Sequence, residues 1–221
     1  MCGRYALSSK LEDLVEAFGV PPVDFAYEPR YNIAPSQMAP VVATGSHGTK
    51  MGLLRWGLIP SWANDPSIGS RMINARAETL LSKPAFKEAA GVRRCLVPAN
   101  GFYEWVEETG DKIPFWVHPP NEALISFAGL WEPWRPSGQD SVYSFTIITV
   151  EASDSIRHLH HRMPAIISAE NRHAWLDGSV LHEEPLELLK PFADQLDAYP
   201  VSTLVNSTAN DIPECVKPAT S

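Results

Sequence analysis

Short apolar segments of β type recur through the middle of the chain, and turns rich in polar residues, glycine and proline separate them. They lie at 41–44, 51–57, 94–97, 102–108, 113–117, 124–129 and 142–150. Thr109–Lys112, between two of these segments, is typical of a hairpin turn. Because the segments are short and rich in β-branched and aromatic residues, they predict a β-rich centre of mostly antiparallel strands.

Helical patterns are short. The apolar residues of segment 10–18 fall on one helical face, Ser9–Glu12 has the spacing of a capping box, and Gly19 provides a stop. This segment is therefore predicted to be a helix. A second helical pattern at 77–90 is interrupted by Pro84.

The last third of the chain alternates between short helices and short strands. The predicted elements are helices at 153–159, 168–175 and 185–190 and strands at 165–167 and 198–203. No repeat, low-complexity run or long linker divides the sequence. The pattern therefore predicts one domain over 1–221 with an α+β fold, in which short helices flank a curved, mostly antiparallel sheet or open barrel.

Composition fits a globular protein and excludes disorder as the main state. The chain has 221 residues, of which 44% are hydrophobic and 20% charged. A chain of this length buries roughly 70% of its unfolded surface. The net charge is -8, but nine acidic and three basic residues lie in 170–221, so the larger part is nearly balanced. A basic groove in that part is compatible with the overall charge.

The spacing of the cysteines and the hydropathy of the chain predict the cellular compartment of the protein. Cys2, Cys95 and Cys215 lie far apart, and no Cys-x-x-Cys or Cys/His cluster has zinc spacing. We therefore expect a reducing compartment and no metal. No apolar run approaches the roughly 18 residues of a membrane span, and the start of the chain lacks the apolar core of a signal peptide. The expected location is the cytoplasm, or the nucleoid if the source is bacterial, without membrane attachment.

Cys2 is the most unusual candidate for chemistry. Removal of Met1 would leave one residue with both an α-amine and a thiol, which titrate at about 7.7–8.0 and about 8.5. The amine can form a Schiff base with an aldehyde, and the thiol can then add to the imine carbon and close a thiazolidine ring. Taken alone, a cysteine at the second position is more often incidental.

Four further segments place polar residues within apolar or turn-rich sequence, namely 30–35, 73–79, 98–105 and 159–164. Glu104 lies between two aromatic residues, where desolvation would raise the pKa of its carboxyl and make it a general acid, unless strand alternation turns it to solvent. His160 and His161 are expected to point in opposite directions in an extended chain. Asn74 is suited to hold a sugar oxygen or an oxyanion without titrating.

Together these motifs resemble the SRAP family (SOS response-associated peptidase-like), whose members cross-link to abasic sites in single-stranded DNA. The resemblance spans nearly the whole chain. The matching motifs are Met-Cys-Gly-Arg at 1–4, Arg-Tyr-Asn-Ile-Ala-Pro at 30–35, Trp-Gly-Leu-Ile-Pro-Ser-Trp at 56–62, Ile-Asn-Ala-Arg-Ala-Glu-Thr at 73–79, Asn-Gly-Phe-Tyr-Glu-Trp at 100–105, Ile-Thr-Val-Glu-Ala at 148–152, His-His-Arg-Met-Pro at 160–164 and Tyr-Pro-Val-Ser at 199–202. Each motif is weak by itself, but their fixed order is specific.

The resemblance implies a role for each matching residue. It assigns the covalent nucleophile to Cys2 and the other catalytic positions to Asn74, Glu104 and His160. It implies DNA-binding roles for Arg4, Asn32, Arg76, Thr149 and Arg162 and base stacking for Trp62. His161 occupies a position that varies within the family, and we interpret it as a neighbour of His160 that contacts a phosphate. Ser61 stands where other members can carry a second aromatic residue, which leaves the width of the stacking wedge open.

The implied function is a sensor of abasic sites in single-stranded DNA. Such a protein forms a thiazolidine cross-link through Cys2 and shields the lesion, with lyase activity as a side reaction and without any cofactor. We expect a monomer, with replication proteins as candidate partners. Two alternatives stay open. One is an N-terminal-cysteine peptidase or amidohydrolase that also removes its own initiator segment, and the other is a non-covalent binder of single-stranded DNA in which Cys2 is incidental.

Overall fold

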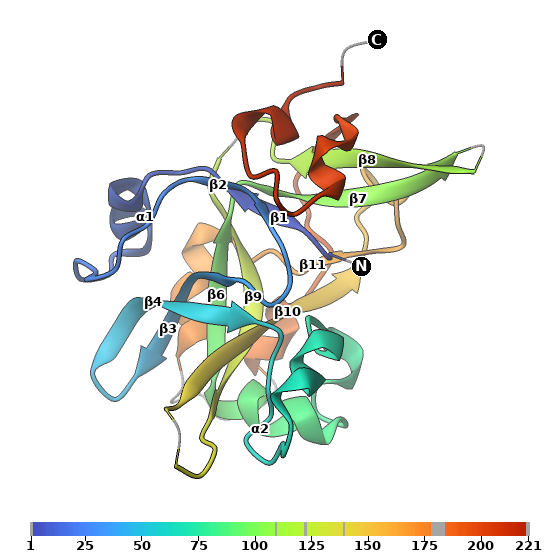
Figure 1. The fold of residues 1–221 in the computed structure, drawn as a ribbon. Helices are drawn as coiled ribbons and strands as arrows, with labels where there is room; N and C mark the ends of the chain where they lie inside the picture. The colour runs from blue at the N-terminus through green and yellow to red at the C-terminus, as the bar shows by residue number, and fades with distance from the viewer. Residues whose placement is uncertain (1, 109, 122, 139, 178–183, 220–221) are drawn as a thin grey trace.

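The computed structural model describes residues 2–108, 110–121, 123–138, 140–177 and 184–219, and it contains two sheets (Figure 1). The first sheet has five antiparallel strands in the order β12–β8–β7–β1–β2. These strands are β1 (Tyr5–Leu7), β2 (Arg30–Ile33), β7 (Gly101–Glu108), β8 (Asp111–His118) and β12 (Asp197–Pro200). β7 and β8 pair as far as Glu108 and Asp111, so the predicted hairpin is confirmed, with Lys112 inside its second strand.

The second sheet closes on itself. Its strands are β3 (Met38–Gly45), β4 (Gly48–Trp56), β5 (Asn74–Arg76), β6 (Arg94–Ala99), β9 (Ile125–Trp134), β10 (Val142–Glu151) and β11 (Arg162–Pro164). Pairing runs from β10 through β4, β3, β6 and β9 back to β10. Strand β10 is parallel to β4 and β5, and the remaining pairs are antiparallel. The α+β class is therefore confirmed, and the predicted open barrel is a closed ring of five strands.

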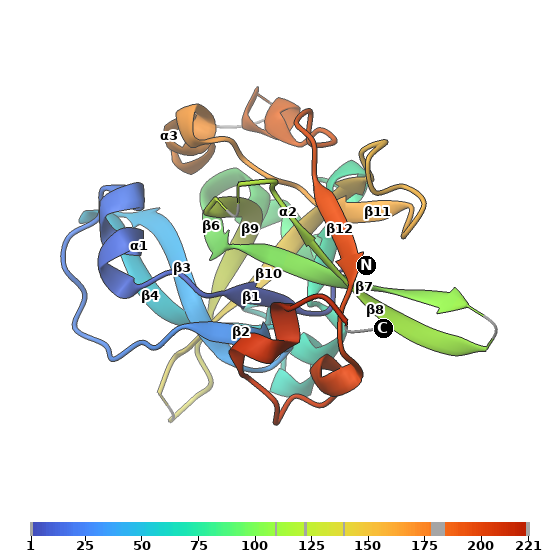
Figure 2. The same ribbon diagram turned by 90° about the horizontal axis from the view of Figure 1, so that it is seen from above.

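Short helices flank the sheets (Figure 2). The α-helices are α1 (Leu11–Phe18), α2 (Pro84–Val92) and α3 (Arg172–Leu176), and the 3-10 helices are η1 (Pro66–Arg71), η2 (Ala77–Thr79), η3 (Ala169–Asn171), η4 (Glu184–Leu188), η5 (Thr203–Asn206) and η6 (Pro213–Val216). The last two lie against β8 and β2. None of the helices in the described ranges has the length and apolar character that crossing a bilayer requires.

The predictions for the first two helices are confirmed only in part. Helix α1 is confirmed, and Gly19 ends it in the left-handed conformation with φ of 58°. The predicted capping box is wrong, because Lys10 occupies the N-cap and no side chain caps the helix. Pro84 is the first residue of α2, where the missing N–H of proline costs nothing.

The predictions for the last third of the chain are partly wrong. Residues 154–159 form turns rather than a helix, and β11 precedes the strand predicted at 165–167. The helix predicted at 168–175 is split into η3 and α3, Pro185 lies in the short helix η4, and the last strand ends at Pro200. Pairing with β8 and β10 decides the bounds of these strands more than local preference does.

Tyr5 joins the two sheets. Its side chain is fully buried, and its ring centroid lies 5.2 Å from that of Trp56 and 5.9 Å from that of Phe127, both in the barrel. Phe102 of β7 packs on the same Phe127 at 6.0 Å. These contacts have the edge-to-face geometry that aromatic rings prefer. The shared core supports the prediction of one domain and holds β1, with the start of the chain, against the barrel.

Gly57 directs the chain out of β4 and into the loop that leads to β5. Its φ is 119°, and a Cβ at this position would lie 2.6 Å from the carbonyl oxygen of Gly69. Its N–H also donates to the carbonyl oxygen of Phe145 at 2.8 Å. Because neither the backbone angle nor the space admits a side chain, the placement of Asn74 at the start of β5 depends on this glycine.

Gly57→Ala is expected to lower the free energy of unfolding by about 3 kcal/mol, because it adds backbone strain and a clash with a carbonyl oxygen. The matched control is Gly91→Ala in α2, where a Cβ would meet nothing within 4 Å. That control should be neutral or stabilising by up to about 1 kcal/mol. Urea denaturation of both variants measures the difference, and equal stabilities would contradict the assigned role of Gly57.

Candidate active site

The start of the chain lies between the two sheets. β1 pairs with β7, and the N–H of Tyr103 donates to the carbonyl oxygen of Arg4 at 2.9 Å. In both views the chain begins beside β7 and β11 (Figures 1 and 2). The Cys2 side chain is completely buried, and its thiol donates to the carbonyl oxygen of Arg4 with an Sγ–O distance of 3.8 Å. The predicted nucleophile is therefore part of the core.

Asn74 holds the backbone of Cys2. Its Nδ2 donates to the carbonyl oxygen of Cys2 at 2.7 Å. β10 fixes this position, because Ile147 pairs with Asn74. The Oδ1 of Asn74 is buried and has no hydrogen-bond partner among the described residues. This oxygen is an acceptor beside Cys2 that a substrate hydroxyl or an amine can satisfy.

Glu104 is buried on β7 and faces Cys2 rather than solvent. Only 5% of it is exposed, and its charge is the second cause, after burial, that raises the pKa of the Cys2 thiol. Burial likewise raises the pKa of the Glu104 carboxyl, while the amino-terminal charge acts in the opposite direction. The neighbouring Tyr103 packs on Trp116 at 4.9 Å in a separate apolar cluster. Both faces of β7 are thus covered. The side chains of Tyr103 and Glu104 point to opposite faces of the strand, and both are buried.

His160 and His161 do not point in opposite directions, and this prediction is wrong. Their rings stack with centroids 4.4 Å apart, and a bend at His161 breaks the extended conformation on which the prediction rests. Nδ1 of His160 lies 2.9 Å from the backbone nitrogen of Arg162 and 3.1 Å from the carbonyl oxygen of Arg162. In the tautomer that accepts from the Arg162 N–H, Nε2 carries the proton. Burial and neighbouring positive charges lower the pKa of His160. At neutral pH this ring is an uncharged donor.

Arg162 anchors the segment that carries His160. Its guanidinium donates to both carboxylate oxygens of Glu78 at 2.7 and 3.0 Å and to the backbone oxygen of Thr149 at 2.6 Å. The Arg162 side chain is 9% exposed, and Thr149 is fully buried. The DNA contacts predicted for these two residues stay predictions, and their structural contacts already account for most of their polar groups.

Arg4 and Asn32 lie against the C-terminal segment. Arg4 Nη1 donates to Asn32 Oδ1 at 2.7 Å and to the backbone oxygen of Val205 at 2.8 Å. Asn32 is fully buried, and its amide donates to the backbone oxygens of Ser207 and Asn210 at 3.0 and 2.6 Å. Arg4 is half-buried and keeps a face toward solvent, whereas Asn32 is enclosed by the residues that it holds, and its predicted DNA contact stays a prediction.

Three predicted DNA contacts are accessible. Trp62 is 58% exposed and borders a cavity of about 270 Å³ that Asn64 and Arg71 also line. Arg76 is exposed at the end of β5, where it pairs with Thr149, and His161 is exposed beside His160. Arg76 and His161 thus lie on elements that border β10. Within the described part of the chain, no three metal-ligating side chains gather here or elsewhere.

The arrangement combines the buried thiol of Cys2 with a carboxyl and an imidazole whose pKa values burial shifts toward the uncharged forms. Because the pKa of the Cys2 thiol is raised, the thiolate is scarce at neutral pH, and attack by sulfur needs a proton acceptor nearby. The carboxyl of Glu104 has a raised pKa and the ring of His160 a lowered one, so both favour their neutral forms. Such a site suits addition to a carbonyl followed by loss of water.

Comparison of the chain with known proteins shows the family to which it belongs. The family model described as "SOS response associated peptidase (SRAP)" matches residues 1–208. The chain belongs to the SRAP family. A crystal structure of a protein from Bacteroides thetaiotaomicron has the same fold, with a TM-score of 0.89 and 29% identity over 99% of this chain and 100% of that one.

Two SRAP relatives carry functional names. The abasic site processing protein YoqW of Bacillus subtilis is 41% identical over 98% of this chain and 99% of its own length. The abasic site processing protein HMCES of Gallus gallus is 36% identical over 87% of this chain and 67% of its own length. The bacterial relative therefore matches from end to end, whereas the animal relative extends beyond the shared part.

Sequence reasoning missed two residues that support the site. Glu78 holds Arg162 across 84 positions of sequence, and Asp211 accepts from Arg30 and from the backbone N–H of Asn32. In the sequence, neither Glu78 nor Asp211 differs from an acidic residue expected on the surface. Only their long-range partners give them a role, and no local pattern could have revealed these partners.

Glu78→Gln is expected to lower the free energy of unfolding at about pH 7 by about 1 kcal/mol, because the pair is half-exposed on the Glu78 side. The Arg162 guanidinium lowers the pKa of Glu78. The contribution is therefore complete above the unfolded pKa of about 4.3 and is lost as the pH falls through the lower folded value. Thermal unfolding from about pH 7 to about pH 3 should show a gap between wild type and variant that closes with acid. A gap that persists would contradict the ion pair.

Proposed function

We propose that this SRAP protein processes abasic sites in single-stranded DNA by covalent attachment through Cys2, after Met1 has been removed. The observation that carries the proposal is the contact between Asn74 and the backbone of Cys2, beside the buried carboxyl of Glu104. Removal of Met1 turns the amide nitrogen of Cys2 into an amine on the same tethered backbone. The names of the relatives support the choice of abasic DNA as substrate.

The first chemical task is to open the sugar. An abasic deoxyribose is mostly a closed hemiacetal. In its protonated form the carboxyl of Glu104 gives its proton to the ring oxygen, while the proton of the C1′ hydroxyl passes to water and the C1′ aldehyde forms. The Cys2 amine then adds to the C1′ aldehyde, and loss of water gives the imine. Asn74 Oδ1 accepts from the sugar hydroxyl, and Nε2–H of His160 donates to the departing oxygen or to the 3′ phosphate.

The thiol completes the cross-link. Sγ of Cys2 adds to the imine carbon, the thiol proton ends on the former imine nitrogen, and a five-membered thiazolidine results. Without this step the imine acidifies the C2′ protons, so β-elimination breaks the strand. The buried thiol therefore diverts a lyase intermediate into a stable adduct, which shields the lesion.

DNA retention relies on local positive charge in an acidic protein. Three basic side chains border the start of the chain and can contact phosphates, namely Arg76, His161 and the exposed face of Arg4. Trp62 offers an exposed face on which a base stacks. Thr149 and Arg162 contribute by holding the strand and the loop that carry these groups.

A peptidase is the second candidate, because the family description names one. Cys2 would then attack a peptide carbonyl. The raised pKa of its thiol and its complete burial disfavour this chemistry, which requires a thiolate that reaches an extended substrate. Cleavage of the bond after Met1 is the one peptide reaction that this position favours.

Cys2→Ser is expected to abolish the heat-stable adduct with single-stranded DNA that contains an abasic site, while an imine that borohydride can trap persists, because the amine remains. Intact mass and denaturing gels measure both products. The matched control is Cys215→Ser, which replaces another buried thiol and should cross-link normally.

Other outcomes separate the alternatives. Equal heat-stable adduct from Cys2→Ser and wild type would refute the thiazolidine. Turnover of a peptide without adduct formation would favour the peptidase. Unchanged DNA retention without any covalent mass gain in the wild type would favour the non-covalent binder.

Glu104→Gln is expected to slow cross-linking about a hundredfold, because the general acid is lost. In the wild type the rate should fall as rising pH removes the Glu104 proton, since burial raises the pKa but does not prevent ionisation. In Glu104→Gln this alkaline decline should disappear, whereas the acid limb set by the amine remains. Adduct formation measured between about pH 5 and about pH 9 tests this. Glu107→Gln, an exposed acid on the same strand, is the control and should retain the wild-type profile.

A further inference from the structure

The backbone groups of β4 alternate between its two edges. The N–H of Trp56 donates to the carbonyl oxygen of Gln37, at 2.9 Å, on the side of β3. The N–H of the next residue, Gly57, donates to Phe145 of β10 at the other edge. Because β3 and β4 pair without a shift in register, the same alternation holds back along β4.

The outer edge of β4 is open over most of its length. The N–H and C=O groups of Met51 and Leu53 point to the edge at which β10 lies, but β10 pairs with β4 only at Arg55 and Trp56. Over the described ranges, no other backbone group bonds to Met51 or Leu53 at this edge. An unpaired strand edge is a template for another extended chain.

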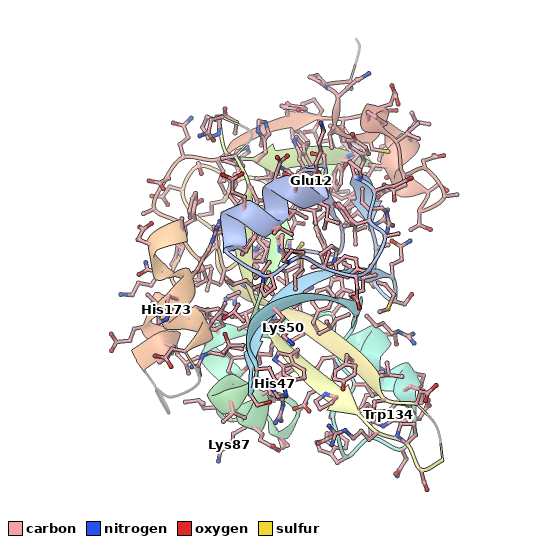
Figure 3. All side chains as sticks on the ribbon, turned by 90° about the vertical axis from the view of Figure 1, so that its left-hand side faces the viewer. Glu12, His47, Lys50, Lys87, Trp134 and His173 are labelled. Carbon is pink, nitrogen blue, oxygen red and sulfur yellow. The ribbon has the colours of Figure 1, made fainter. Side chains whose placement is uncertain are left out.

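A groove of about 370 Å³ runs along this edge. Its walls are the hairpin of β3 and β4 and the aromatic pair Trp131 and Tyr143, whose ring centroids are 6.2 Å apart. Tyr143 is 45% exposed, and Gly52 leaves the floor open because it has no side chain. Figure 3 shows the hairpin with its labelled His47 and Lys50 beside strands β9 and β10.

The charge of the groove is opposite to that of the protein. His47 and Lys50 are the basic residues that line it, and Lys50 is exposed. No acidic residue of the described chain lines this groove, although the protein has a net charge of -8. The groove therefore attracts acidic segments that most of the surface repels.

We infer that the open edge of β4 and its groove bind an extended acidic peptide segment of a partner protein, which adds to β4 as a further strand. Alternating N–H and C=O groups at strand spacing match another polypeptide backbone, whereas a nucleic acid offers no such series. Every second side chain of the peptide lies over the groove, where its apolar side chains contact Trp131 and Tyr143 and an acidic side chain lies near Lys50. The edge from Thr49 to Leu53 accommodates about five residues of strand, roughly 15 Å.

This surface is separate from the residues of the proposed DNA chemistry, so the two fail or succeed independently. The test uses the full chain and fluorescence anisotropy. The probe is a pool of fluorescein-labelled peptides of about eight residues, in which every second position carries either Asp or Glu or an apolar residue (Phe, Leu or Ile), each peptide contains both kinds, and Thr fills the positions between. Two comparison pools carry Lys in place of the acids, or N-methyl groups on alternate amides.

The acidic pool is expected to bind saturably, and both comparison pools are expected to lose binding. Lys50→Glu and Tyr143→Ala should each weaken binding about tenfold or more, because they remove the charge and the aromatic wall. The matched control Lys87→Glu, an exposed lysine on α2, should bind like the wild type. Cross-linking to abasic DNA should be unchanged in all three variants.

Four outcomes would overturn the inference. The first is no binding by any acidic peptide, and the second is equal binding by the N-methylated pool, which would exclude strand addition. The third is displacement of the peptide by oligothymidylate, which would identify the groove as a DNA surface. The fourth is self-association in sedimentation that Lys50→Glu abolishes, which would identify a second copy of this chain as the occupant.

Discussion

The hydrogen bond from the Asn74 amide to the carbonyl oxygen of Cys2 is the constraint on which the site depends. A chain terminus normally frays, because little holds it. Here β1 is held in the first sheet, its aromatic residue is packed into the barrel, and residue 2 is fastened from the side by β5. Cys2 thereby acquires the positional order of a core residue, which is what the proposed chemistry by proximity requires.

Electrostatics add a second constraint, because the site favours neutral forms. Burial pushes the carboxyl of Glu104 and the thiol of Cys2 toward their protonated states and pushes the ring of His160 toward its deprotonated state. The charged groups lie one layer further out, in the pair of Glu78 and Arg162. The buried part of the site thus favours uncharged groups, and the ion pair outside it holds the loop that carries His160.

How far the sequence predicts this structure varies with the kind of interaction. Alternating apolar segments located β6 to β10, because strand pairing and local pattern agree there. The same reasoning failed at 154–159 and at the stacked pair His160 and His161, where tertiary contacts override local preference. Burial of Glu104 could not be decided from alternation, because both faces of β7 are covered. Ring closure of the barrel depends on two-residue pairing between β4 and β10, which leaves no local signal.

Complete burial of Cys2 also limits the oxidation of its sulfur. Peroxides oxidise thiolates that solvent can reach, and each step toward sulfinic acid is harder to reverse. A thiol with no exposed surface and a raised pKa resists this chemistry without a disulfide partner or a protective metal. Cys2 therefore stays reduced under oxidative conditions that would modify an exposed thiol.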